Sequence, residues 1–154
     1  MSNKSFNKKL INEEVNFEEV NPSNRPVISQ TDIRGIITYT NSVFRKLSGY
    51  KKGEMLGKPH NIIRHPDMPK IIFKELWDTV LNGKAWNGVI KNLRKDGRYY
   101  WVEAFITPIY HDNGMIIGFS SARKKVDENL KKYYEKKYKE MKLKELKDNN
   151  NIYN

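Results

Sequence analysis

The chain of 154 residues carries a net charge of +11, and 38% of its residues are hydrophobic. That composition suits one core domain of about 100 to 130 residues between more polar ends. Because there is no cysteine, a disulfide framework, a thiolate nucleophile and cysteine-ligated zinc or iron–sulfur sites are excluded. The positive charge is spread along the chain, much of it on a lysine-rich tail typical of a solvated helix, so we expect no nucleic-acid partner.

A polar arm precedes the first strands. Residues 1–26 contain "NEEVNFEEVNPSNRP", with scattered apolar residues and then helix-breaking residues at 21–26. We expect a short helix or a flexible arm there, followed by a domain boundary. The runs "VISQTD" and "GIITYTN" favour β-structure, and Ile33-Arg34-Gly35 between them predicts a tight hairpin.

Two short helices and one long helix are predicted next. The stretch "SVFRKLSGY" has three apolar residues on one helical face and ends at Gly49, and "KKGEMLG" predicts another helical turn that ends at Gly57. In "MPKIIFKELWDTVLNG" apolar residues recur at helical spacing, which predicts a long helix. Asp67 stands where an N-cap belongs, Pro69 falls in the tolerant first turn, and Gly83 follows the end.

From Ala85 the apolar period changes to two. The runs "WNGVIKNLR", "RYYWVEAFITPIY" and "MIIGFSSARK" predict three strands, separated by hairpin signals at 95–97 and 111–114. Two opening strands are too few for a stable sheet, so we expect them to join the last three. The prediction is an α+β domain over residues 27–124, with one five-stranded antiparallel sheet and helices on one face.

The C-terminal region is predicted to be a helix over residues 125–148, followed by a disordered tail over 149–154. Apolar residues from Val126 to Met141 step by three or four along this helix. The narrow stripe fits either a coiled-coil partner or packing on the domain, and it is too short and too rich in lysine for a firm heptad assignment.

The segment "HNIIRHPDMP", residues 60–69, gathers two of the three histidines with an arginine and an aspartate. A zinc site fails because His60, His65 and Asp67 lack the helical pair spacing and prolines interrupt them. Either histidine is available as an axial haem ligand. Arg64 beside a helix N-terminus suits a clamp on an anion or ring carbonyl, with a surface arginine as the alternative. Asp67 fits helix capping and ligand binding equally well.

Three residues outside this segment have more than one interpretation. Trp77 on the long helix is more typical of the core than of a ligand wall. Trp86 fits core and ligand wall equally. Asn92 has an amide that both donates and accepts, yet it also reads as an exposed strand residue.

The segments "PHNIIRHPDMPKIIFKELW" and "WNGVIKNLRKDGRYYWVEAFITPI" together resemble the FAD-binding PAS sensor domain of bacterial aerotaxis receptors. The resemblance covers about residues 27–124 and neither tail. It implies the PAS fold, with FAD held between the sheet and the helical side. It also implies that Arg64, His65 and Asp67 belong to the motif on which flavin binding depends. By the same resemblance, five further residues would line or approach the flavin ring: Asn41, Phe73, Trp86, Asn92 and Tyr100.

The resemblance further implies a cytoplasmic energy-taxis sensor that reports the redox state of FAD. Aerotaxis receptors continue into a membrane anchor and a signalling domain, whereas this sequence ends after one further helix. We therefore expect a separate receptor-like signalling partner of the methyl-accepting chemotaxis type, and a homodimer is also open to the chain. A haem-binding gas sensor and a cofactor-free interaction or dimerisation module stay open as alternatives, as does FMN in place of FAD.

Signatures of catalysis and of membrane insertion are missing from the sequence. "SSARK" is not a nucleophile elbow, and the chain has no glycine-rich phosphate loop and no paired carboxylates at a readable spacing. We expect a non-enzyme. No apolar run approaches the roughly 18 residues of a spanning helix, and residues 1–20 lack a signal peptide's apolar stretch, so we expect a soluble protein without a membrane span.

Overall fold

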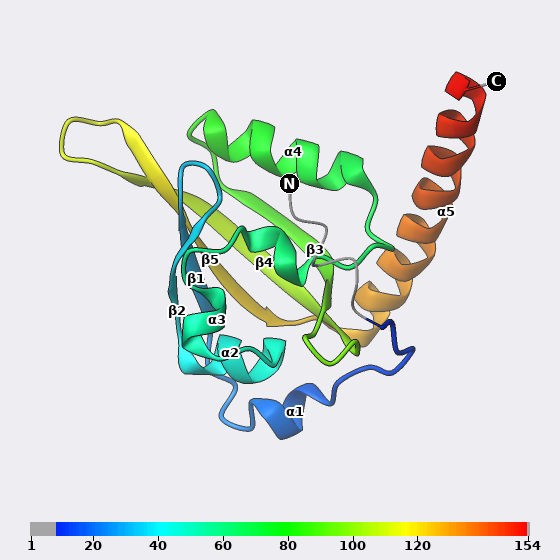
Figure 1. The fold of residues 1–154 in the computed structure, drawn as a ribbon, viewed down its shortest axis with the longest axis horizontal. Coiled ribbons are helices and arrows are strands. Elements are labelled where there is room, and N and C mark those ends of the chain that lie inside the picture. The colour runs from blue at the N-terminus through cyan, green and yellow to red at the C-terminus, as the bar shows by residue number, and fades with distance from the viewer. Residues whose placement is uncertain (1–8, 154) are drawn as a thin grey trace.

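The computed structural model describes residues 9–153 of the chain (Figure 1). Helices and strands follow one another in an order close to the predicted one. The elements are α1 (Phe17–Val20), β1 (Val27–Asp32), β2 (Ile37–Thr40), α2 (Ser42–Ser48), α3 (Lys52–Met55), the 3-10 helix η2 (His60–Ile63), α4 (Lys70–Leu81), β3 (Trp86–Leu93), β4 (Tyr99–Tyr110), β5 (Ile116–Lys125) and α5 (Glu128–Tyr153).

The five strands form one antiparallel sheet in the order β2-β1-β5-β4-β3. The first strand pairs with the last, so that Val27 lies opposite Arg123 and Asp32 opposite Gly118. The prediction that the two opening strands join the three closing ones in a sheet with helices on one face is therefore confirmed. Helix α4 crosses this face along its upper part, and α2 and α3 cover its other end (Figure 1).

The helix ends follow from capping residues with one exception. The Asn41 side chain accepts the Phe44 N–H at 3.0 Å at the start of α2, and Gly49 ends that helix with a φ of 80°, as glycine permits. The predicted N-cap role of Asp67 is wrong, because Pro69 keeps an extended backbone (ψ 137°) and α4 begins only after it. The N–H of Lys70 is instead bound by the Glu145 carboxylate of α5 at 3.0 Å.

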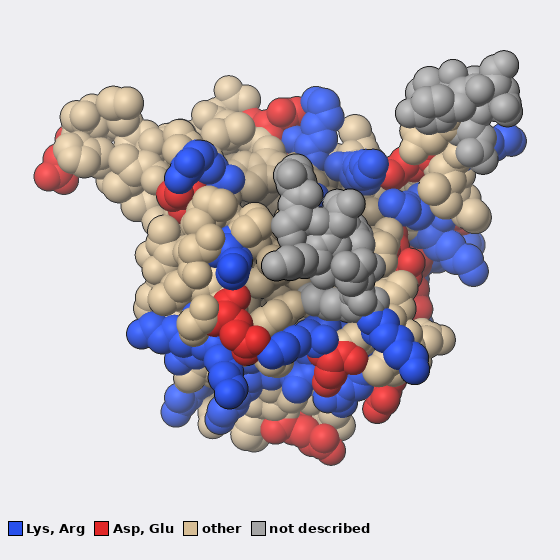
Figure 2. Space-filling model, in the orientation of Figure 1, with Lys and Arg blue, Asp and Glu red and all other residues tan. Residues whose placement is uncertain are grey.

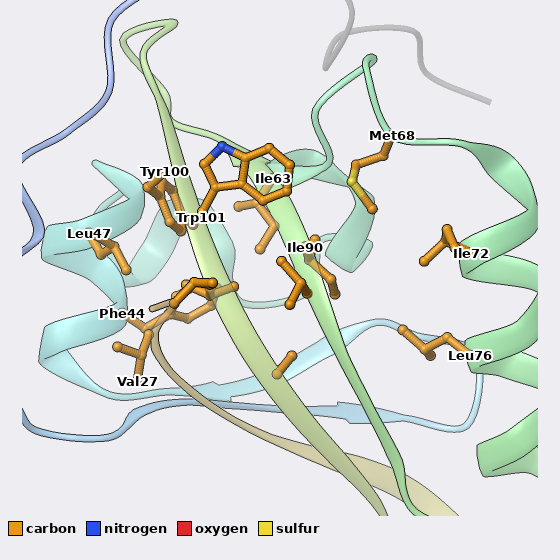
Figure 3. Packing of buried hydrophobic residues seen from close by; sticks show 14 of the residues in the cluster. Val27, Phe44, Leu47, Ile63, Met68, Ile72, Leu76, Ile90, Tyr100 and Trp101 are labelled. Atoms are coloured by element: carbon orange, nitrogen blue, oxygen red, sulfur yellow. The ribbon is translucent and has the colours of Figure 1, made fainter. Parts of the chain in front are cut away.

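The core lies between the sheet and its helices (Figure 3). Ile72 and Leu76 point from α4 toward the sheet, where Ile90 lies on β3. Phe44 on α2 is fully buried at the other end of the same layer. As the alternation of apolar residues in the sequence predicts, one face of each strand lies toward the helices.

The described part of the N-terminal arm packs on the domain. The Ile11 N–H donates to the carbonyl of Gly97 and the Val15 N–H to that of Tyr99, both at 2.9 Å. Phe17 on α1 is buried. The predicted short helix in the arm is thus confirmed, while its first eight residues lie outside the described residues.

Helix α5 begins at Glu128 and continues to Tyr153, through most of the segment for which a disordered tail was expected. Of the two expected roles for its apolar stripe, packing on the domain is the one observed. The Tyr138 ring is buried and stacks on Trp101 with ring centroids 6.2 Å apart, and its hydroxyl donates to the Val89 carbonyl at 2.7 Å. No helix within residues 9–153 has both the length and the apolar character needed to cross a bilayer.

Replacing Tyr138→Phe should lower the free energy of unfolding by about 1 to 2 kcal/mol, because the Val89 carbonyl loses its buried donor. Urea titration followed by circular dichroism measures the change. The matched control is Tyr133→Phe on the same helix, which should be neutral since the Tyr133 side chain is exposed. Equal stability of Tyr138→Phe and the wild type would show that α5 is not held by this bond.

Basic side chains do not gather into one continuous patch on the face shown in Figure 2. Acidic side chains lie among the lysines and arginines over the lower half of that face. Ion pairs between acidic and basic side chains include Lys131 with Glu14 at 2.7 Å and Arg94 with Asp96 at 2.8 Å. Several basic side chains are thus paired with carboxylates, and the net charge of +11 is the excess of 29 lysines and arginines over 18 acidic residues.

Candidate functional site

A pocket lies between the inner face of the sheet and the helical layer. Its cavity volume is about 80 Å³, and part of the pocket is open to solvent. Apolar walls come from α4 and η2 and from β3, β4 and β5. The polar residues come from β1, η2, the loop after η2, β3 and β5. The lining residues are Ser29, Thr31, His60, Ile63, Arg64, Phe73, Leu76, Trp77, Val80, Ile90, Asn92, Ile106, Phe119, Ser121 and Arg123.

The floor of the pocket carries a polar cluster on strands β1 and β5. The Arg123 guanidinium donates to Ser29 Oγ and to His60 Nε2, each at 2.9 Å, and lies 4.6 Å from the centroid of the Phe44 ring. An arginine only donates, so His60 Nε2 must be unprotonated and the imidazole neutral with its proton on Nδ1. Burial, with Arg123 close by, lowers the pKa of His60 to about 3.

The rim of the pocket is formed by Arg64 and Phe73. The Arg64 guanidinium lies over the Phe73 ring, 3.7 Å from its centroid, which is a close cation–π contact. The Arg64 backbone forms an antiparallel bridge with Asn92 on the edge strand β3, and this fixes where the side chain starts. Burial lowers the pKa of Arg64, and its Nε atom has no hydrogen-bond partner.

His65 and Asp67 lie in the same loop but are not among the residues that line the pocket. The Asp67 carboxylate is exposed and binds Lys91 Nζ at 2.9 Å. The Asp67 N–H donates to His65 Nδ1 at 3.0 Å, so His65 is neutral. Burial, with a smaller effect of Lys91, lowers the pKa of His65 to about 4. Burial alone would raise the pKa of Asp67, but the bond to Lys91 and the nearby cations bring it below its usual range.

The other predicted residues divide into two groups. Phe73 and Asn92 line the pocket together with Arg64. Asn41, Trp86 and Tyr100 are not among the lining residues.

Each of these three has another role in the fold. Asn41 caps α2 and binds the Ile28 N–H. The Trp86 indole lies over Gly88 on its own strand, where a Cβ at Gly88 would come within 2.3 Å of the ring. The Tyr100 hydroxyl is buried without a hydrogen bond of normal geometry, and burial raises the Tyr100 pKa well above its usual range.

Several pocket residues were absent from the sequence-based set. His60 was considered only as a metal or haem ligand. Trp77 was expected in the core rather than in a ligand wall, but it lines the pocket and meets Phe119 edge-on at 5.4 Å. Ser121 and Arg123 belong to "SSARK", where alternation along β5 places Phe119, Ser121 and Arg123 on one face. This alternation is the sequence pattern from which the polar side chains at the floor of the pocket could have been predicted.

The candidate ligands of a zinc site do not converge. Within residues 9–153, no group of three or more His, Asp or Glu side chains stands close enough to hold a metal ion. His60 and His65 are each engaged by a different donor, as described above.

Comparison with known proteins identifies the fold and its relatives. An aerotaxis receptor of Escherichia coli (strain K12) is 43% identical over 105 residues, which are 68% of this chain and 21% of the receptor, so the chain spans about a fifth of that relative. The solved PAS domain of a protein from Colwellia psychrerythraea has 32% identity and a TM-score of 0.61 over 66% of this chain and 86% of that one.

A more distant likeness concerns the fold alone. A structure titled for a flavin analogue and the light-oxygen-voltage domain mechanism has a TM-score of 0.66 at 22% identity, over 77% of this chain and 90% of that one. Residues 37–123 match the model of the family described as PAS fold, which is more than half of the chain. The sheet, the helical layer and the pocket described above are thus those of a PAS domain, and the chain belongs to the PAS fold family.

Proposed function

We propose that this chain is a cytoplasmic redox sensor that binds FAD in the pocket of its PAS domain and reports the state of the flavin to a separate signalling protein. The observation that carries the proposal is a set of buried polar atoms without partners around an apolar space. Thr31 Oγ1, Ser121 Oγ and Arg64 Nε all belong to residues that line the pocket. Such atoms are rare in folded proteins, and a polar ligand in the pocket would satisfy them.

The donor set fits a flavin. An isoalloxazine is a flat plate with a polar edge, so it needs apolar walls and a few fixed hydrogen-bonding groups. Ile90 and Leu76 lie on opposite sides of the pocket and supply such walls. Asn92 offers an amide that donates and accepts, and therefore remains bonded when the protonation of its partner changes. The 43% identity with an aerotaxis receptor supports the same assignment.

When bound, a flavin would supply reversible electron transfer, and the residues of the chain would convert its state into a change of shape. Asn92 and Arg64 are linked through the bridge between their backbones, so a change at the pocket edge reaches the loop before α4. Met68 in that loop accepts the Lys91 N–H at 3.4 Å through its sulfur, and its carbonyl faces Lys142 of α5. Helix α5 therefore lies at the end of a continuous path from the pocket.

The receiving protein is proposed to be of the methyl-accepting chemotaxis type, since an aerotaxis receptor is a relative of this chain. The exposed apolar side chains Leu143 and Leu146 on α5 are available for such contact. In this proposal the chain changes the shape of a surface and performs no catalysis. A ligand shifts an equilibrium between two shapes only by its different affinity for them.

Haem is the second candidate, and the hydrogen bonds of the histidines argue against it. His60 Nε2 accepts from Arg123 and His65 Nδ1 from the Asp67 N–H, so an iron at either atom would displace a bond that is already made. A cofactor-free interaction module is the third candidate. It leaves the buried polar atoms of the pocket unexplained.

Absorption spectra of the purified and FAD-reconstituted protein test the proposal. Flavin bands that bleach on reduction support it, and chromatography of the extracted pigment separates FAD from FMN. A Soret band would assign the pocket to haem. Colourless protein after reconstitution would leave the interaction module as the function.

Replacing Asn92→Ala should weaken FAD binding about tenfold, because a buried hydrogen-bonding side chain leaves the pocket wall. Equilibrium titration of flavin fluorescence gives the dissociation constant. Asn87→Ala is the matched control on the same strand, since Asn87 is exposed and faces away from the pocket. If both variants bind FAD as the wild type does, Asn92 is not a flavin ligand.

A further inference from the structure

Arg123 carries a buried charge that no carboxylate balances. Its side chain donates to Ser29 Oγ and His60 Nε2 at 2.9 Å and approaches the Val27 carbonyl at 3.5 Å, all of which are neutral groups. Arg123 is 4% exposed. No aspartate or glutamate is among the residues that line the pocket, and within residues 9–153 no ion pair of Arg123 is found. Burial lowers the pKa of Arg123 to about 10, so the guanidinium remains charged at neutral pH.

This arrangement is unfavourable in a protein that has nothing else to bind there. Taking a charge out of water without a counter-ion is costly, and buried charges are normally paired. His60 does not relieve the cation, because its Nε2 accepts from Arg123 and the ring is neutral. The floor of the pocket therefore carries one positive charge that is available to bind an anionic group.

Two hydroxyl groups on the same inner face of the sheet have no hydrogen-bond partners. Thr31 Oγ1 and Ser121 Oγ are buried, and both residues are more than nine-tenths buried and line the same pocket. The sheet register explains the grouping. Ser29 lies opposite Ser121 and Val27 opposite Arg123 on neighbouring strands, so the side chains share one strip of the inner face.

We propose that Arg123, Thr31 and Ser121 form a subsite that binds the anionic edge of the reduced flavin, so that the unpaired guanidinium favours the reduced state over the oxidised one. The inference rests on the proposed function and adds to it the part of the pocket that responds to the charge of the flavin. The hydroxyl groups of Thr31 and Ser121 donate hydrogen bonds to the same edge of the flavin. They can do so whether the flavin is oxidised or reduced.

The charge balance of reduction gives the subsite its role. When a quinol reduces a bound flavin, its two O–H bonds break and two electrons move to the flavin. One proton forms the N5–H bond and the other goes to solvent. The flavin therefore gains one negative charge, which a nearby cation stabilises in a low-dielectric site.

Electrochemical titration of the flavin-loaded protein tests the inference. Arg123→Met should lower the ratio of reduced to oxidised flavin at a fixed potential about tenfold, which is about 30 mV for a two-electron couple. Arg34→Met removes the same charge from a side chain that is 80% exposed, and its potential should equal that of the wild type. A wild-type potential in Arg123→Met overturns the subsite.

A second pair of variants keeps Arg123 in place, and the first measurement on it needs no bound flavin. Ser121→Asp supplies a carboxylate beside the guanidinium, whereas Ser121→Asn has the same shape without the charge. In flavin-free protein the ratio of folded to unfolded chains should be about tenfold higher for the aspartate variant, which corresponds to one pKa unit of interaction. In flavin-loaded protein the aspartate variant should hold less reduced flavin than the asparagine variant at the same potential.

The outcomes separate this inference from the proposed function. Equal stability of Ser121→Asp and Ser121→Asn would show that the charge of Arg123 is already balanced, which overturns the subsite. A wild type that holds no flavin after reconstitution overturns the proposed function and the ligand of the subsite together. A wild type that holds flavin, with equal potentials in the aspartate and asparagine variants, overturns the subsite alone.

Discussion

Acidification from pH 7 to pH 4 should destabilise the fold by several kcal/mol, mainly through His60 and His65. The pKa of His60 falls from 6.5 to about 3 on folding, and that of His65 from 6.5 to about 4. Below pH 6.5 the unfolded chain therefore binds more protons than the folded one, and stability falls with pH until the folded pKa is reached. At 1.36 kcal/mol per pKa unit, His60 alone accounts for about 3 kcal/mol at pH 4.

The source of this acid sensitivity can be separated by substitution. The groups whose charge disfavours protonation of His60 are Arg123 on β5 and Arg64 in the loop before α4. His60→Gln keeps an acceptor for Arg123 and removes the titration, so urea unfolding at pH 7, 6, 5 and 4 should show a shallower loss. His111→Gln, in the exposed β4–β5 hairpin, is the control and should follow the wild type. An unchanged slope in His60→Gln would contradict the assignment.

Phe44→Ala should lower the free energy of unfolding by about 3 to 5 kcal/mol, because a fully buried ring leaves a cavity. The effect should extend to the pocket. Phe44 stacks on His60 with ring centroids 5.8 Å apart and lies under the Arg123 guanidinium, so its loss frees both groups of the pocket floor.

Urea titration measures the stability of this variant, and a flavin titration at low temperature measures the affinity of the chains that remain folded. Phe105→Ala is the matched control, since Phe105 lies on β4, is 51% exposed and should change stability by less than about 1 kcal/mol. Similar losses in the two variants would show that the ring at position 44 is not a support of the floor.

The fold could be predicted from the sequence because its signals are local and agree with one another. Period-two runs separated by glycine turns marked the strands, and the 3.6 period marked α4. The start of α4 was misplaced, because Asp67 has the residue type of an N-cap but Pro69 delays the helix, and Glu145, 75 positions away from Lys70, binds the first N–H. A cap supplied from a distant helix leaves no local pattern.

The site was predictable only in part, for a related reason. Arg64, Phe73 and Asn92 were expected at the pocket and do line it. Residue types in a loop do not show which side each faces, and Asp67 turns toward Lys91. Arg123 was missed because a charged residue in a strand normally faces water. Alternation with the buried Phe119 indicates that Arg123 faces inward, and the pairing of β1 with β5 then places it next to Ser29.

The position of Glu145 and Lys142 has a consequence for how the last helix communicates with the pocket. Both side chains hold backbone groups of residues 68–70, directly after the loop that carries Arg64. Pulling this helix away exposes those groups to solvent and loosens the rim. A protein that binds the helix then changes the affinity of the pocket for its ligand by some factor. Thermodynamic reciprocity requires that the ligand change the affinity of that protein for the helix by the same factor.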